Sequence, residues 1–475
     1  MIVASLTQGA TIMSTQRRTP QQGGEARSEG ISYQELLDRE QRDVPEVLRI
    51  VDCEDMGDAP IPAESYTSRA WHDAEMERMW PRVWQMACRE EELPKVGDHV
   101  LYEIGTTSLL IVRSAEDRIQ ALHNVCLHRG RQLRTAGGCV AKFRCPFHGF
   151  TWNLDGSLRE IPCEWDFPHI DKEGFSLPEA KVDTWGGFVF VNLDGQAPPL
   201  EEYLGVIPEH FARWKLEDCV KAVHVQKRIA CNWKVVMEAF IESWHSLATH
   251  PQILPYTADA NSQYDTFGPN VSRTITAMGV PSPHTPDVAE QEIINALHGT
   301  SGRMTTETGI DLTVPEGLTA REHMANINRS EFGAMFGMDL SDATDAEVLD
   351  AVLYSAFPNF VPWAGYNPNI VYRFRPDGDD PDSAIMDVMI LMRVGPDMER
   401  PSPCPVHRLG DDEPWSSAEE LGGLGIIFDQ DMGNLPYVQK GLKSSPNNQV
   451  QLGSYQEARI RHLHRTLDGY LGRES

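Results

Sequence analysis

The spacing of apolar residues changes along this chain and divides it into unlike parts. Residues 71–84 place Trp, Met and Val side chains at helical intervals, which predicts a short helix. Apolar and polar positions then alternate over residues 97–112 and 188–192, which predicts strands. With the turn at residues 154–156, these strands predict a small all-β domain that ends before residue 200.

Beyond residue 200 helical and extended patterns are mixed, and the sequence has no internal repeat. The predicted helices are residues 233–247, 290–297, 346–354 and 455–471, and the predicted strands are residues 271–277, 370–374 and 384–394. This mixture predicts an α+β domain with an antiparallel sheet and helices to one side. Residues 1–30, by contrast, lack apolar periodicity and predict a disordered lead.

The composition is that of a globular protein in a reducing compartment. The 475 residues are 41% apolar and 24% charged, enough for about two or three domains. Nine cysteines at irregular spacing argue against a disulfide framework. No apolar run is long enough to span a bilayer and the first residues lack a secretory signal, so we expect a cytoplasmic protein with no membrane partner. A formal net charge of −28 excludes nucleic acid as a general partner.

Two short motifs each pair one cysteine with one histidine: Cys126-x-His128 and Cys145-x-x-His148. Two thiolates can hold one iron of a [2Fe–2S] cluster while two imidazoles hold the other, which raises the reduction potential above that of an all-cysteine cluster. A structural zinc site is the alternative, but zinc modules usually group cysteine with cysteine and histidine with histidine. The spacing therefore favours a Rieske [2Fe–2S] cluster.

The segment between these motifs is basic in an otherwise acidic chain. It carries Arg129, Arg131, Arg134, Lys142 and Arg144 and no acidic residue. Most charge runs are solvated surface, yet this one flanks the predicted redox centre, where it is suited to steer an acidic electron donor. Both interpretations stay open.

A second metal site is indicated within and after the predicted helix at residues 233–247. Glu238, Glu242 and His245 share one helix face, opposite the apolar stripe, and such a face is usually solvated. His250 changes this interpretation, because the proline after it favours a non-helical backbone that can bring the two histidines together. Two imidazoles and one carboxylate are the ligands that non-haem ferrous oxygenases use, with positions left open for dioxygen.

The sequence pattern leaves the carboxylate ligand undecided. Glu242 lies one turn before His245 and is better placed to orient that imidazole than to bind the metal. Asp429 and Asp431 follow an apolar run and are equally plausible as ligands by spacing alone. Glu238 is either the buried partner of another side chain or a plain surface residue.

Together these motifs resemble the oxygenase (alpha) component of Rieske non-haem iron oxygenases, of the kind that includes aromatic-ring-hydroxylating dioxygenases. The matching motifs are Cys126-x-His128, Cys145-x-x-His148, Asn232-Trp233-Lys234, Glu242-x-x-His245-x4-His250 and Asp431-x-x-Asn434. The resemblance covers residues 65–475 and implies two cofactors, a [2Fe–2S] Rieske cluster held by the Cys and His motifs and a mononuclear Fe(II) held by His245, His250 and Asp431.

The resemblance also implies the domain organisation. Residues 1–60 would be a disordered or irregular extension, and residues 61–200 an all-β Rieske domain with a leading helix. Residues 201–475 would be a helix-grip (START/Bet v1-like) catalytic domain with an antiparallel sheet and helices.

In this family a carboxylate links the two metal sites across a subunit boundary. The matching residue is Glu242, between His148 of the partner subunit and His245 of its own chain. Most relatives have Asp there, and Glu occurs in a minority such as carnitine oxygenases. Ala239 and Trp244 also depart from the usual Asn and Tyr. The link implies a homotrimer, with a beta subunit as a further option.

The function implied by the resemblance is that of a terminal oxygenase. It would use O2 and electrons from a separate ferredoxin and/or flavin reductase, since no dinucleotide fingerprint follows a predicted strand. The expected reaction is hydroxylation of an aromatic or other apolar organic substrate, in a pocket walled by Phe240, Ile253 and residues 271–281 and 357–366. The alternatives are O- or N-demethylation or cleavage of a quaternary amine, which Glu242 favours, and a non-catalytic Rieske electron carrier.

Overall fold

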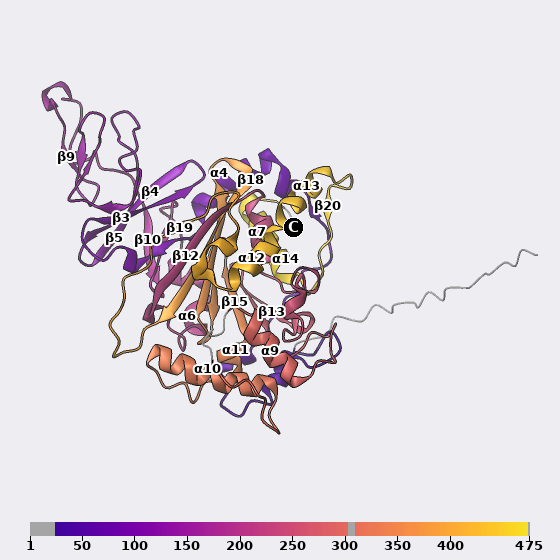
Figure 1. Cartoon of the computed structure of the whole chain (residues 1–475). Coiled ribbons are helices and arrows are strands. Elements are labelled where there is room, and N and C mark those ends of the chain that lie inside the picture. The colour runs from indigo at the N-terminus through magenta and orange to yellow at the C-terminus, as the bar shows by residue number, and fades with distance from the viewer. Residues whose placement is uncertain (1–23, 303–308, 474–475) are drawn as a thin grey trace, which may run out of the picture.

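The computed structural model describes residues 24–302 and 309–473. Figure 1 shows a small β-rich part, at the upper left, that projects from a larger body built on one long sheet with helices around it. Of the predicted disordered lead, residues 1–23 lie outside the described residues.

The segment before the first sheet lies along the larger body. It contains the short helices α1 (Tyr33–Leu37) and α2 (Glu46–Arg49). The backbone N–H of Asp52 donates to Asp265, and Arg273 donates to carbonyls at both ends of α2. The segment therefore covers an edge of the larger sheet. The domain boundaries at residues 60/61 and 200/201 stay predictions.

The β-rich part is built on a seven-stranded antiparallel sheet. Its strands, in spatial order, are β2 (Gln85–Arg89), β11 (Phe188–Asn192), β10 (Glu179–Trp185), β5 (Arg118–His123), β4 (Thr107–Ala115), β3 (Asp98–Ile104) and β6 (Gly138–Cys139). The predicted helix before it is α4 (Arg69–Arg78), which continues as the 3-10 turn η1 (Trp80–Arg82). The predicted all-β domain is confirmed.

A three-stranded sheet forms the tip of this part. It consists of β7 (Phe143–Arg144), β8 (Thr151–Trp152) and β9 (Leu158–Glu160). The tip has its own small apolar cluster around Phe143, Phe150 and Trp152, separate from the main core. The cysteine and histidine motifs lie in loops on this tip.

The larger body is built on an eight-stranded sheet that is antiparallel except at one edge, where β12 and β19 are parallel. Its strands, in spatial order, are β13 (Gln263–Phe267), β14 (Val271–Thr276), β15 (Ala351–Ala356), β16 (Val361–Ala364), β17 (Asn369–Asp377), β18 (Asp380–Arg393), β12 (Cys219–Ile229) and β19 (His407–Arg408). The predicted antiparallel sheet is therefore confirmed.

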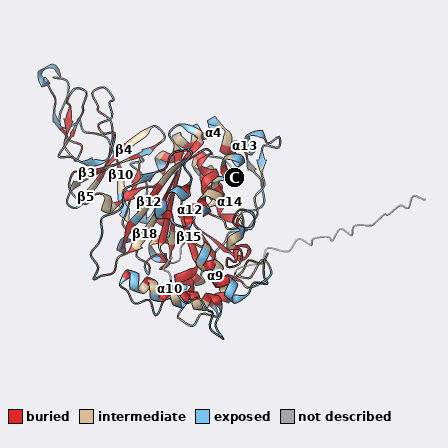
Figure 2. Ribbon diagram, viewed as in Figure 1, coloured by how far each residue is buried: buried red, intermediate tan, exposed pale blue. Residues whose placement is uncertain are grey.

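Helices surround this sheet on one side and at one end (Figure 1). The helices at the site are α7 (Trp233–Ala239), α8 (Ser246–Thr249), α12 (Leu424–Met432), α13 (Leu435–Ser444) and α14 (Ala458–Leu471). The helices at the end of the sheet are α9 (Glu290–Thr300), α10 (Ala320–Phe336) and α11 (Asp345–Leu349). Shorter elements are α3 (Glu64–Thr67), α5 (Leu200–Leu204), α6 (Ile207–His210), β1 (Ile61–Pro62) and β20 (Gln449–Val450). Figure 2 shows that buried residues gather between these helices and the sheet.

Two predicted helices are wrong in extent. The helix predicted at residues 233–247 ends at Ala239, because the Glu242 carboxylate accepts hydrogen bonds from the N–H groups of Trp244 and His245 and replaces the helical pattern. The helix predicted at residues 346–354 ends at Leu349, and an extended run, β15, follows. The long helix α10 was not predicted.

The helix α7 is buried on nearly all sides. Apolar residues at helical spacing continue beyond its end, so the sequence predicted a longer helix. Lys234 is fully buried and paired with Glu75 of α4 at 2.5 Å, and the Trp233 indole N–H donates to the same carboxylate. None of the nine cysteines is in a disulfide bond. None of the helices in the described ranges is both long and apolar enough to cross a membrane.

Candidate active site and the two metal-binding regions

The two Cys and His loops on the tip have the same main-chain hydrogen bonds. In each loop the cysteine N–H donates to a carbonyl further along, and the cysteine carbonyl accepts from a glycine N–H. The partners are Arg131 and Gly130 for Cys126, and Phe150 and Gly149 for Cys145. Both glycines have positive φ, 74° and 82°, a conformation that favours glycine. The sequence therefore folds two matched loops around one centre.

The four side chains on these loops suit an iron–sulfur cluster. Both cysteines are 2% exposed, and burial raises the pKa of the Cys126 thiol, so a thiolate there needs a positively charged partner. The imidazoles of His128 and His148 lie 4.7 Å apart between ring centroids. Nδ1 of His128 is buried without a hydrogen-bond partner among the described residues, and a metal would occupy that position. The donor set fits a [2Fe–2S] group.

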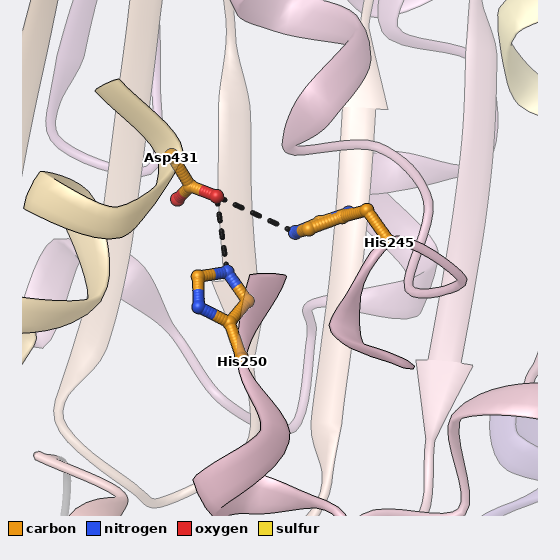
Figure 3. A group of neighbouring side chains, drawn as sticks. All are labelled: His245, His250 and Asp431. Carbon is orange, nitrogen blue, oxygen red and sulfur yellow. Dashed lines mark hydrogen bonds and ion pairs between the residues drawn. The ribbon is translucent and has the colours of Figure 1, made fainter. Parts of the chain in front are cut away.

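Three residues from two distant segments meet in the larger body (Figure 3). His245 and His250 stand at the two ends of α8, and Asp431 comes from α12. Their ligand atoms all lie within 4.8 Å of one another. Nε2 of His250 is 3.0 Å and Nε2 of His245 is 3.5 Å from Oδ1 of Asp431. The predicted trio is thus brought together.

The opposite nitrogens of both imidazoles are held by side-chain oxygens. His245 Nδ1–H donates to Glu242 Oε1 at 2.6 Å, and His250 Nδ1–H donates to Gln430 Oε1 at 2.8 Å. With Nδ1 protonated, a neutral imidazole presents the Nε2 lone pair to the Asp431 carboxylate. Two acceptors facing each other at this distance need a proton or a metal ion between them, and the geometry fits a bound metal ion.

The electrostatics of this site also favour a cation. Burial alone would lower the pKa of His245, but the carboxylates of Glu242 and Asp431 outweigh it and raise the pKa to about 9. When a metal takes the place of the proton, the same two carboxylates stabilise its charge.

The structure separates the two aspartates that spacing left undecided. Asp429 accepts hydrogen bonds from the backbone N–H groups of Trp415 and Ser416, at 2.6 and 3.1 Å. Asp431 is 4% exposed and points at the imidazoles. Gln430, between them, was missed from the sequence, and its only signal was its place beside the candidate ligands.

The structure also locates two other residues or segments that the sequence singled out. Glu238 is a partly buried partner of another side chain, since its Oε1 lies 2.7 Å from Nε2 of His464 on α14. The basic side chains Arg129, Arg131 and Arg144 are exposed on the tip beside the exposed His148, and none has an ion pair among the residues described.

A cavity of about 170 Å³ adjoins the trio and is lined by His245, His250 and Asp431. Its remaining wall is mostly apolar and contains the aromatic side chains Phe240, Trp363, Tyr372 and Phe428. Phe240, Ile253 and strand β14 line it as predicted. Of residues 357–366, however, only Trp363 does, because Phe357 and Phe360 are buried in the core.

The small β-rich part and the larger body each match the model of a known protein family. Residues 83–171 match the model of the Rieske [2Fe-2S] domain, and residues 209–473 match the model of the ring hydroxylating alpha subunit (catalytic domain).

Relatives include enzymes of two kinds. The chain is 32% identical over 195 residues to the glycine betaine monooxygenase oxygenase subunit of Pseudomonas aeruginosa, which covers 41% of this chain and 45% of that protein. It is 33% identical over 190 residues to the biphenyl 2,3-dioxygenase subunit alpha of Rhodococcus jostii. This match covers 39% of this chain and 41% of that protein. The chain thus spans less than half the length of these curated relatives.

Solved structures show the same fold. A quaternary ammonium Rieske monooxygenase superposes with a TM-score of 0.63 at 19% identity, covering 90% of this chain and 99% of that one. Naphthalene 1,2-dioxygenase from Rhodococcus sp. superposes with a TM-score of 0.57 at 19% identity. This match covers 87% of this chain and 94% of that one.

Proposed function

Because the chain belongs to the family of Rieske oxygenases with a ring-hydroxylating alpha-subunit catalytic domain, we propose that it is the terminal oxygenase of a multicomponent system. One observation carries the proposal. His245, His250 and Asp431 meet at the wall of a largely apolar cavity, in the same chain as the Cys and His loops. An electron carrier would need no such cavity beside a second metal site.

Cys126, Cys145, His128 and His148 would hold the cluster, and His245, His250 and Asp431 the mononuclear iron. When bound, the cluster supplies single electrons and the ferrous ion activates dioxygen for attack on the substrate.

The chain's own residues prepare this second site. Glu242 and Gln430 hold the Nδ1 protons of His245 and His250, which fixes both rings and leaves each Nε2 free for the metal. The apolar cavity wall excludes water from the substrate.

Electrons would pass between subunits. Figure 1 shows the tip with its Cys and His loops projecting away from the sheet and helices of the larger body. That body holds His245, His250 and Asp431, called the iron trio below. His148 is exposed on that tip, and the Glu242 side chain is 9% exposed. We propose that Glu242 lies between His148 of the partner subunit and His245 of its own chain, in a homotrimer with or without a beta subunit. A separate ferredoxin and/or flavin reductase would reduce the cluster, and the basic tip is suited to an acidic donor.

For the substrate we propose an aromatic or other apolar organic molecule. Phe240, Trp363, Tyr372 and Phe428 line one cavity, and Phe240 lies 5.0 Å from Tyr372 and 5.9 Å from Phe428 between ring centroids. Such a wall stacks well on an apolar ring.

A quaternary amine is the second candidate, attacked at a carbon next to nitrogen. The same aromatic wall can contact a cation through its ring faces. Glu242 in place of Asp, and the relatives that act on glycine betaine, support this candidate.

Product analysis tests the proposal. The holoenzyme is supplied with O2, a generic ferredoxin and its reductase, and incubated separately with biphenyl, naphthalene, glycine betaine, carnitine and choline. Hydroxylated arenes support the first candidate, and aldehyde release from an amine supports the second. Oxygenated product from neither group, with both metals bound, would contradict the proposal.

A further inference from the structure

The peptide groups on both sides of Glu242 are tied to one pair of neighbouring strand residues. The N–H of Ser243 donates to the hydroxyl of Tyr264 at 3.2 Å, and the carbonyl of Ile241 accepts from the hydroxyl of Thr274 at 3.2 Å. Tyr264 and Thr274 face each other across β13 and β14. Because α7 ends before Glu242, these side chains replace the helical hydrogen bonds that would otherwise hold this loop.

A buried arginine of α14 completes this arrangement. Arg459 is 1% exposed, and its guanidinium donates to the Ile241 carbonyl at 3.2 Å, to the Thr274 hydroxyl at 2.6 Å and to the Ser272 hydroxyl at 3.0 Å. Thr274 also lines the cavity beside the iron trio. Arg459 thus connects the loop of Glu242 with the cavity wall.

The charge of Arg459 is buried without a direct ion pair. Within the described ranges no carboxylate lies within ion-pair distance of it, and its Nη2 has no hydrogen-bond partner. Burial lowers the pKa of Arg459 to about 9. Arg273 and Arg321, also buried, are paired with Asp265 and Asp350, whereas Arg461 donates only to carbonyls but has an acceptor for each of its three guanidinium nitrogens. A buried cation without an ion pair destabilises a fold.

We infer that Arg459, Thr274 and Tyr264 are positioning residues that hold Glu242 in the orientation that contacts His245. The inference rests on the proposed function of Glu242 as the electron link. An arginine without a carboxylate partner suits this role, because a carboxylate at Ile241 would repel the adjacent Glu242 carboxylate.

Arg459→Met separates positioning from stability. The variant loses the contacts to Ile241 and Thr274, so we expect electron transfer from cluster to iron to slow roughly tenfold. It also removes the unpaired buried charge, so we expect the Tm of the metal-free protein to stay the same or rise. Arg459→Lys keeps one donor and should restore part of the rate.

Arg461→Met is the matched control. Arg461 is on the same helix, 5% exposed, and donates to carbonyls of Ala59, Leu452 and Gly453, away from the loop of Glu242. Unlike Arg459, it has an acceptor for each of its three guanidinium nitrogens, so we expect its loss to lower the Tm and leave electron transfer unchanged.

The rate is the return of cluster absorbance after dithionite-reduced holoenzyme is mixed with oxygenated buffer, with iron content measured alongside. His245→Ala gives the background rate. The inference is overturned if Arg459→Met matches the wild-type rate, or slows only with loss of iron or a Tm decrease like that of Arg461→Met. A wild-type rate equal to the His245→Ala background would instead overturn the proposed function itself.

Discussion

The two metal-binding regions of this molecule are built in opposite ways. The tip takes all four donors from two short loops with the same hydrogen bonds, and its apolar cluster is separate from the main core. The trio of His245, His250 and Asp431 comes from the two ends of α8 and from α12, far apart in sequence, and adjoins a largely apolar cavity. An exposed tip suits electron exchange, whereas an apolar cavity beside metal ligands suits chemistry on a substrate.

The largest expected effect comes from removing one donor at either region. Cys145→Ser should abolish the cluster spectrum while iron at the trio persists, because the tip has its own core. His245→Ala should abolish turnover while the cluster spectrum persists. Visible absorbance and iron analysis of both variants check this, and loss of both metals in either variant would show that the regions are not independent.

Glu242→Gln tests the link between the regions. Both metals should stay bound, because Glu242 is not a predicted ligand, while electron transfer between them slows roughly 100-fold. Single-turnover absorbance measures the transfer. Glu238→Gln, one turn earlier and bonded to His464, is the control and should leave it unchanged. Wild-type transfer in Glu242→Gln would refute the link.

Gln430→Leu should weaken the iron site alone. Without the Gln430 carbonyl the His250 ring loses the acceptor that fixes it, so we expect about a tenfold lower iron affinity at the trio. A chelator competition measures the affinity. An unchanged affinity would show that packing alone orients His250.

The loop glycines of the tip allow a smaller, local test. Gly149→Ala forces a positive φ on alanine, which costs about 1–2 kcal/mol, and its Cβ would lie 3.1 Å from Cγ of Pro162. Gly130→Ala has a similar φ, but nothing lies within 4 Å of its Cβ. Cluster retention on heating should therefore fall more in Gly149→Ala. Equal retention in the two variants would contradict the crowding at Gly149.

The metal-free protein should show opposite histidine titrations. The pKa of His245 is raised from 6.5 to about 9, so its protonated form stabilises the fold below pH 6.5, and this contribution is lost as the pH rises through about 9. Desolvation, His148 and Arg129 lower the pKa of His128, so protonation there destabilises the fold as the pH falls below 6.5. NMR titration should find His245 above and His128 below 6.5. The same midpoint for both would contradict this contrast.

The same difference in construction explains how far the sequence could be interpreted. The tip donors were predictable because each short motif determines its own loop. At the trio, His245 and His250 were identified, but the choice between Asp429 and Asp431 depends on how α12 packs, which local spacing does not encode. The helix predicted at residues 233–247 was too long because its apolar pattern continues past Ala239, where hydrogen bonds of Glu242 and Ser243 end the helix. Arg459 gave no signal, since its contacts join segments separated by roughly half the chain.

In this proposal one chain holds two different iron centres. Iron and acid-labile sulfide analysis of the anaerobically purified protein, with its visible spectrum, tests it most directly. The account predicts about three irons and about two sulfides per chain, with the absorbance of a Rieske cluster. Zinc in place of iron, or about two irons per chain with none lost on Asp431→Ala, would contradict it.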